Sequence, residues 1–143
     1  MTLDDEDDHQ APQRKDAVPG RIAVVGPCAS GKSLLVRSLR ELGFDARHVA
    51  QEHSYVKDMW ARLSRPEVLV FLDAELPTIR LRGRATFPER LLREERVRLS
   101  DARTRCDVYV ATDVLNPVEV RAVVLAELAN LGLRPCATDE PGS

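Results

Sequence analysis

Cysteine is scarce in this chain of 143 residues, and Cys28, Cys106 and Cys136 lie far apart with no Cys-x-x-Cys pair. The pattern therefore predicts neither a disulfide framework nor a zinc site of the usual spacing. Long apolar runs are missing as well. The clearest one, residues 68–72, is far shorter than the roughly 20 residues that span a bilayer, so we expect no membrane-spanning segment.

The N-terminus lacks the basic start and apolar stretch of a secretory signal, because residues 4–8 are all acidic. We therefore expect a cytoplasmic protein. Aromatic residues make up only 4% of the chain, and none is interleaved among the arginines of residues 89–105. Since proteins that bind single-stranded nucleic acid stack bases on aromatic rings, we expect no nucleic-acid partner.

Lysine is also rare: Lys15, Lys32 and Lys57 are the only three. None lies in an Asn-Lys-x-Asp sequence, which disfavours a guanine-specific switch protein. Arginine is abundant instead, and residues 80–105 hold nine arginines against four acidic residues. This excess of positive charge favours an anionic ligand, and the alternative is a solvated helix with internal ion pairs.

The chain divides into a body, residues 21–133, and two flexible tails, residues 1–20 and 134–143, which carry no core-forming pattern. Within the body, short apolar runs alternate with amphipathic segments. We expect strands over 21–25, 47–51, 67–73 and 107–112, and helices over 33–42, 55–63, 76–81, 89–105 and 117–131. This alternation predicts an α/β fold with a mostly parallel sheet of about four strands in the order 2-1-3-4.

Residues 26–33 (GPCASGKS) match the Walker A pattern Gly-x4-Gly-Lys-Ser/Thr between a predicted strand and a predicted helix. In this pattern, backbone N–H groups and the helix N-terminus surround a phosphate. Lys32 reaches the β and γ oxygens, and the Ser33 hydroxyl binds Mg²⁺. The residues expected to bind ATP or another nucleoside triphosphate are Gly26, Pro27, Cys28, Ala29, Ser30, Gly31, Lys32, Ser33 and Leu34.

Three further segments extend the pattern beyond this loop. Residues 68–73 (VLVFLD) precede a short helix and the sequence RLRGR at 80–84, and residues 107–113 (DVYVATD) precede LNPVEV at 115–120. Together with the Walker A pattern they resemble the P-loop nucleoside and nucleotide kinase-like family, which includes adenylate, shikimate and gluconate kinases.

The resemblance implies a three-layer P-loop NTPase fold and phosphoryl transfer from ATP and Mg²⁺. It implies that residues 80–105 form a lid-like segment over the nucleotide. By position, Arg80 and Arg84 are expected to contact the phosphates, with Arg82 as a further candidate. Guanidinium groups suit this role because they offer paired donors to phosphoryl oxygens.

Family members also place an acidic residue after the strand next to the loop strand, where it holds a Mg²⁺-bound water. Glu52 and Asp73 both fit this description. We prefer Glu52, because Asp73 ends the strand that leads into the lid. The predicted metal-associated residues are therefore Ser33 and Glu52, and the predicted catalytic residues are Lys32, Glu52, Arg80 and Arg84.

Two functions stay open. The first is a small phosphotransferase whose acceptor is a small molecule. The second is a nucleotide-binding regulatory module or slow NTPase read by a protein partner, which the short acceptor region, residues 44–66, favours. His48, Glu52 and His53 lie close together in the sequence but match no zinc spacing.

Overall fold

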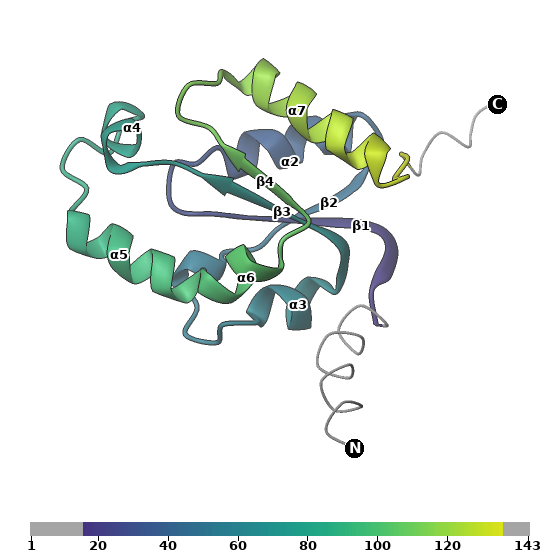
Figure 1. Cartoon of the computed structure of the whole chain (residues 1–143), viewed down its shortest axis with the longest axis horizontal. Helices are drawn as coiled ribbons and strands as arrows, with labels where there is room; N and C mark the ends of the chain where they lie inside the picture. The colour runs from purple at the N-terminus through teal and green to yellow at the C-terminus, as the bar shows by residue number, and fades with distance from the viewer. Residues whose placement is uncertain (1–15, 136–143) are drawn as a thin grey trace.

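A computed structural model describes residues 16–135. Its four strands form one parallel sheet (Figure 1). The strands are β1 (Val18–Val25), β2 (Asp45–His48), β3 (Pro66–Asp73) and β4 (Val108–Ala111). Their order is β2-β1-β3-β4, which confirms the predicted order 2-1-3-4, and every pair is parallel.

Helices cover both faces of the sheet. They are α2 (Lys32–Glu41), α3 (Met59–Ser64), α4 (Leu76–Leu81), α5 (Glu89–Arg98), α6 (Ser100–Arg105) and α7 (Pro117–Asn130), with a 3₁₀ turn η1 (Gln51–His53). Figure 1 shows α2 and α7 on one face and α3, α5 and α6 on the other. Among the described residues, none of these helices combines the length and apolar character that a membrane crossing needs.

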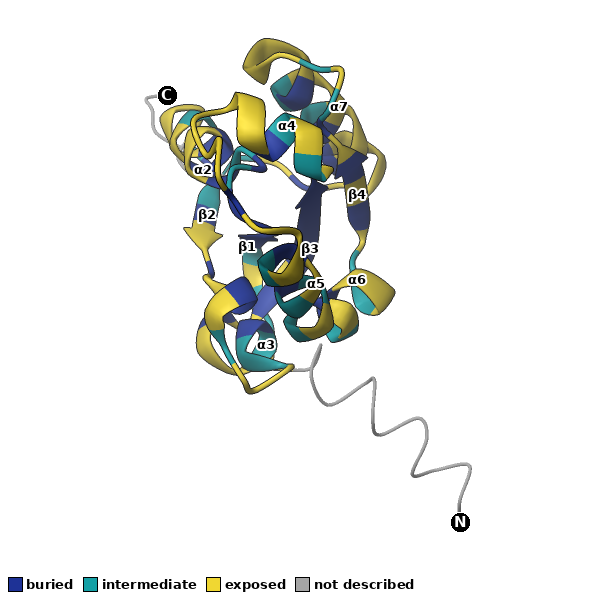
Figure 2. Ribbon diagram, turned by 90° about the vertical axis from the view of Figure 1, so that its left-hand side faces the viewer, coloured by how far each residue is buried: buried dark blue, intermediate teal, exposed yellow. Residues whose placement is uncertain are grey.

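The apolar half of strand β1, residues 22–25, is buried on both faces of the sheet, as its continuous apolar sequence predicts. Ile22 and Val24 pack toward α2 and α7, whereas Ala23 and Val25 pack toward α3 and α6. All four side chains have no exposed surface. Figure 2 shows the same arrangement, with β3 buried between helices whose outer surfaces are exposed, whereas the edge strand β2 is partly exposed. The residues after Val25 therefore leave the sheet at its centre.

The first strand begins three residues earlier than the predicted boundary between the N-terminal tail and the body, residue 21. Strand β1 begins at Val18, inside the segment expected to be a flexible tail. The Val18 amide donates to the Arg65 carbonyl at 2.8 Å, and the Gly20 amide donates to the Glu67 carboxylate at 2.6 Å. These pairings extend the strand past its apolar run. The remaining parts of the two predicted tails, residues 1–15 and 136–143, lie outside the described residues.

The segment after β2 also differs from the prediction. The strand ends at His48 instead of continuing to residue 51, and α3 begins at Met59 instead of residue 55. The cause is Gln51, a fully buried side chain that donates to the Val56 carbonyl and accepts from the Trp60 amide. This polar side chain folds the segment into a turn.

The helix predicted over 89–105 is in fact two helices, α5 and α6. They meet at Leu99, whose backbone has φ −94° and ψ 0°. Leu99 is buried under the sheet together with Ala102. The break lets Leu99 at the junction and Ala102 of α6 pack into the same core.

Candidate functional site

The loop of residues 26–33 connects the carboxyl end of β1 to helix α2 and requires glycine at two positions. Gly26 has φ +153°, and a Cβ there would lie 2.0 Å from the Leu72 carbonyl oxygen. Gly31 has φ +104°, a backbone conformation that residues other than glycine rarely adopt. The two glycines of the Walker A pattern are therefore those that let the backbone turn against β3.

Gly26→Ala tests this close approach. We expect it to lower the free energy of unfolding by at least about 2 kcal/mol more than Gly83→Ala does, because only Gly26 adds an overpacking clash to backbone strain. Gly83 is a matched control, since it has φ +101° and a Cβ added there would meet nothing within 4 Å. Urea unfolding measures both variants, and equal losses would contradict the predicted contact with Leu72.

Backbone amides of this loop are available to a ligand. Within residues 16–135, the N–H groups of Ala29, Gly31, Lys32 and Ser33 donate to no protein acceptor. Gly31 precedes the first turn of α2 and supplies no side-chain cap. Unpaired amides at a helix N-terminus carry partial positive charge and attract anions.

Lys32 is buried and folds back over the loop. Its Nζ lies 2.8 Å from the Gly26 carbonyl oxygen, 2.9 Å from that of Pro27 and 3.1 Å from Oε2 of Glu52. Glu52 extends from η1 and is itself buried. The structure thus brings together two residues that the sequence assigns to one site.

Two buried oxygen atoms at this site have no hydrogen-bond partner among the described residues, Oγ of Ser30 and Oε1 of Glu52. Buried polar atoms are almost always hydrogen-bonded, to protein or to a bound molecule. The Ser33 side chain, in contrast, is exposed at the first turn of α2. Of these three oxygens, Oε1 of Glu52 belongs to the carboxylate that pairs with Lys32, so it is the candidate to bind a cation or an ordered water there.

Asp73, the competing acid, has a different environment at the end of β3. Its carboxylate accepts hydrogen bonds from the Tyr109 hydroxyl at 2.6 Å and the Ala74 amide at 2.9 Å, and it pairs with Arg96 at 3.2 Å. Burial and the bond to Asp73 raise the pKa of Tyr109. Asp73 therefore holds β4 and α5 together, whereas Glu52 lies against Lys32.

Glu95, a fully buried carboxylate on α5, is not among the residues predicted from the sequence. Its Oε1 accepts from the Cys28 amide at 3.1 Å, and its Oε2 accepts from the Cys28 thiol at 3.0 Å. The pKa of the Cys28 thiol is raised to about 11, mainly by burial and then by the hydrogen bond to Glu95. A signal was present in the sequence, because Glu95 lies three residues after Leu92 and four before Leu99, on the apolar face of its helix.

The three arginines of residues 80–84 differ in their contacts with the loop. Arg82 donates to the Ala29 carbonyl at 2.8 Å and to the Thr112 carbonyl at 2.7 Å, so it joins the loop to the end of β4. Arg80 donates to the Phe87 carbonyl at 3.0 Å. Arg84 is exposed and, in the described part of the chain, its side chain forms neither a hydrogen bond nor an ion pair. The structure does not bring Arg80 or Arg84 into polar contact with the loop.

A cavity of about 670 Å³ opens beside the loop. Its walls come from the loop, α2, the end of β4 and the start of α7, and include Gly31, Leu34, Arg82, Thr112, Leu115 and Arg121. Mostly apolar walls with a few polar groups are typical of small-molecule sites.

Comparison with known proteins adds no family to this description. No protein-family model matches the chain, and no curated protein matches it significantly. The assignment of the site therefore depends on its residues and geometry.

Proposed function

We propose that this chain binds a nucleoside triphosphate with Mg²⁺ at the 26–33 loop and transfers a phosphoryl group to a small acceptor. The observation that carries the proposal is the group of unpaired amides at Gly31, Lys32 and Ser33, in the same loop that the buried Lys32 ammonium contacts. They lie at the carboxyl edge of a parallel sheet, where ligands of such folds bind.

The loop residues suit the triphosphate in a specific way. The amides donate to phosphate oxygens, and Lys32 exchanges its bonds to the Gly26 and Pro27 carbonyls for bonds to the phosphates. The hydroxyl of Ser33 and the free oxygen of Glu52 provide hard oxygen ligands, directly or through water, of the kind that Mg²⁺ prefers. Mg²⁺ bound there supplies positive charge to the phosphate oxygens.

The neighbouring cavity suits the base and sugar. Leu34 and Leu115 contribute apolar walls, and Arg82 lies at the boundary between the cavity and the loop. At about 670 Å³ the cavity falls in the usual range of roughly 300–1,000 Å³ for ligand pockets. We propose ATP as the ligand because the chain contains no Asn-Lys-x-Asp sequence to read guanine.

One observation favours a second candidate, a nucleotide-binding module or slow NTPase without an acceptor. Arg80 is bonded to Phe87 instead of the loop, and Arg84 makes no polar contact with it. Phosphoryl transfer depends on positive charge at the transferring group. If these arginines do not reach it, turnover will be slow with any acceptor.

ATP and GTP consumption, measured with and without a panel of nucleosides, sugars and small hydroxy acids, tests the proposal. We expect ATP consumption to depend on Mg²⁺ and to rise with one acceptor class. Slow consumption that no acceptor raises would favour the regulatory module. If neither nucleotide is consumed nor bound, both candidates are wrong.

The two arginines should respond differently to replacement by alanine. We expect Arg84→Ala to lower kcat by at least about tenfold, still less than the roughly 10³-fold effect of a dedicated arginine finger, with an unchanged Tm. Arg80→Ala should lower Tm as well, because it removes the bond to Phe87. Arg90→Ala is the control, since Arg90 is exposed and pairs only with Glu94 among the described residues. An unchanged kcat in Arg84→Ala would remove Arg84 from the reaction.

A further inference from the structure

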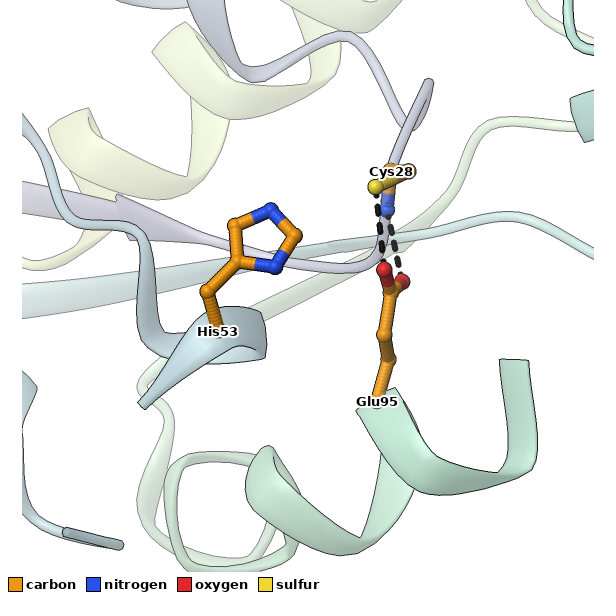
Figure 3. Close-up of side chains that lie close together, drawn as sticks. All are labelled: Cys28, His53 and Glu95. Atoms are coloured by element: carbon orange, nitrogen blue, oxygen red, sulfur yellow. Dashed lines mark hydrogen bonds between the residues drawn. The ribbon is translucent and has the colours of Figure 1, made fainter. Parts of the chain in front are cut away.

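Three potential metal ligands converge beside the loop, each from a different segment. Cys28 belongs to the loop, His53 to η1 and Glu95 to α5. One ligand atom from each lies within 4.8 Å of the others. Figure 3 shows the three side chains together, with the thiol and amide of Cys28 bonded to Glu95. No sequence spacing reveals this cluster, because only the fold assembles it.

Glu95 has an environment that is unusual for a carboxylate. It has no exposed surface, and its hydrogen-bond donors are the amide and thiol of Cys28. Among the described residues, no lysine, arginine or histidine forms an ion pair with it. Since buried carboxylates are usually paired with a positive charge or bound to a metal, this position favours a cation.

We propose that Cys28, His53 and Glu95 bind a divalent cation of the Zn²⁺ class, with the fourth coordination position open to solvent. One sulfur, one nitrogen and one oxygen ligand suit a borderline-soft ion, whereas Mg²⁺ prefers oxygen ligands alone. The His53 side chain is 60% exposed, so an ion can enter from solvent and the ring can turn toward it.

The geometry requires only a small adjustment. Metal–ligand lengths of about 2.0–2.3 Å place the ligand atoms of a tetrahedral site roughly 3.3–3.8 Å apart. The thiol sulfur and Oε2 of Glu95 are already 3.0 Å apart. On binding, the thiol proton passes to water, a sulfur–metal bond forms, and Glu95 exchanges its S–H hydrogen bond for a metal–oxygen bond.

Metal binding would link the loop to α5 and η1, because the three ligands belong to these three segments. Lys32 forms an ion pair with Glu52 of η1. Oε2 of Glu52 also lies 3.6 Å from Nε2 of His53. A loop held by the metal is less free to close around phosphate. Zn²⁺ is therefore expected to weaken nucleotide binding, a consequence that rests on the proposed function, whereas the metal site itself does not.

Co²⁺ and Zn²⁺ titrations of the reduced full-length chain test the site. In a background carrying Cys106→Ala and Cys136→Ala, we expect one equivalent of Co²⁺ to produce a thiolate charge-transfer band, which Zn²⁺ then displaces. Competition with a chromophoric chelator gives the Zn²⁺ affinity. Cys28→Ala, His53→Ala and Glu95→Gln should each weaken it by at least about tenfold, the smallest typical effect of losing even an outer-shell partner.

His48→Ala and Glu94→Gln are the matched controls, and neither should change the affinity. His53→Ala is the decisive variant because its exposed side chain can be removed without disturbing the core. A missing Co²⁺ band, or Zn²⁺ affinity that survives both Cys28→Ala and His53→Ala, would overturn the site. ATP affinity is measured separately with excess Mg²⁺ and a Zn²⁺-selective chelator present, so failure of the proposed function appears as absent ATP binding while the Co²⁺ band persists.

Discussion

Lys32→Ala is expected to weaken Mg²⁺–ATP binding by roughly 100-fold, because a charge-assisted bond to phosphate contributes about 1.5–3 kcal/mol. In the free protein, Lys32 bonds to two loop carbonyls and to Glu52. These contacts hold the ammonium buried against the loop. Isothermal titration calorimetry with Mg²⁺–ATP measures the loss directly.

The same variant breaks a buried ion pair, so its stability must be measured as well. Removing Lys32 leaves the Glu52 carboxylate buried without its cation, which typically costs about 3–5 kcal/mol. Lys32→Ala combined with Glu52→Gln should be more stable than Lys32→Ala alone, since no uncompensated charge is left. Lys57→Ala is the control, because Lys57 is exposed and outside the loop. Unchanged ATP affinity in a folded Lys32→Ala variant would contradict the assignment of the loop.

The second large effect is expected from Glu52→Gln. It should raise the Mg²⁺ concentration for half-maximal turnover by at least about tenfold, since it removes the charge of an acid with a free oxygen beside Lys32. Asp73→Asn should change this requirement less than about twofold. Its main effect should be on stability, about 1–3 kcal/mol, because it weakens the pairing with Arg96 and the bond from Tyr109.

A Mg²⁺ titration of both variants, with thermal unfolding in parallel, separates the two roles. If Asp73→Asn shifts the Mg²⁺ requirement more than Glu52→Gln does, the metal-associated acid is Asp73. If neither variant shifts it, the chain is better described as a nucleotide-binding module without phosphoryl transfer.

The sheet could be predicted from the sequence because its strands are apolar and rich in β-branched residues. The strand segments at residues 68–72 and 22–25 are buried on both faces. Their apolar sequence is therefore enough to locate them as strands. The segment between β2 and α3 could not be predicted in the same way. Its course depends on the hydrogen bonds of one buried amide, Gln51, which a hydropathy pattern does not reveal.

The candidate site shows the same division. The loop is one continuous segment, and Glu52 follows the strand that pairs with β1, so a sequence pattern could predict both. Glu95 and Arg82 reach the loop from 67 and 53 residues away. Such long-range polar contacts depend on how the helices pack. The spacing of Glu95 from Leu92 and Leu99 places it on the apolar face of its helix but does not reveal its partner, and no local pattern separates Arg82 from Arg80 and Arg84.

Whether the 26–33 loop binds a nucleoside triphosphate can be measured by nuclear magnetic resonance of the ¹⁵N-labelled full-length chain during titration with Mg²⁺–ATP. We predict saturable shifts, with one nucleotide per chain, at the amides of Gly31, Lys32 and Ser33, which have no acceptor among the described residues. Thr112, at the wall of the cavity, should shift in parallel. Saturating Mg²⁺–ATP that leaves the three loop amides unshifted would contradict the account.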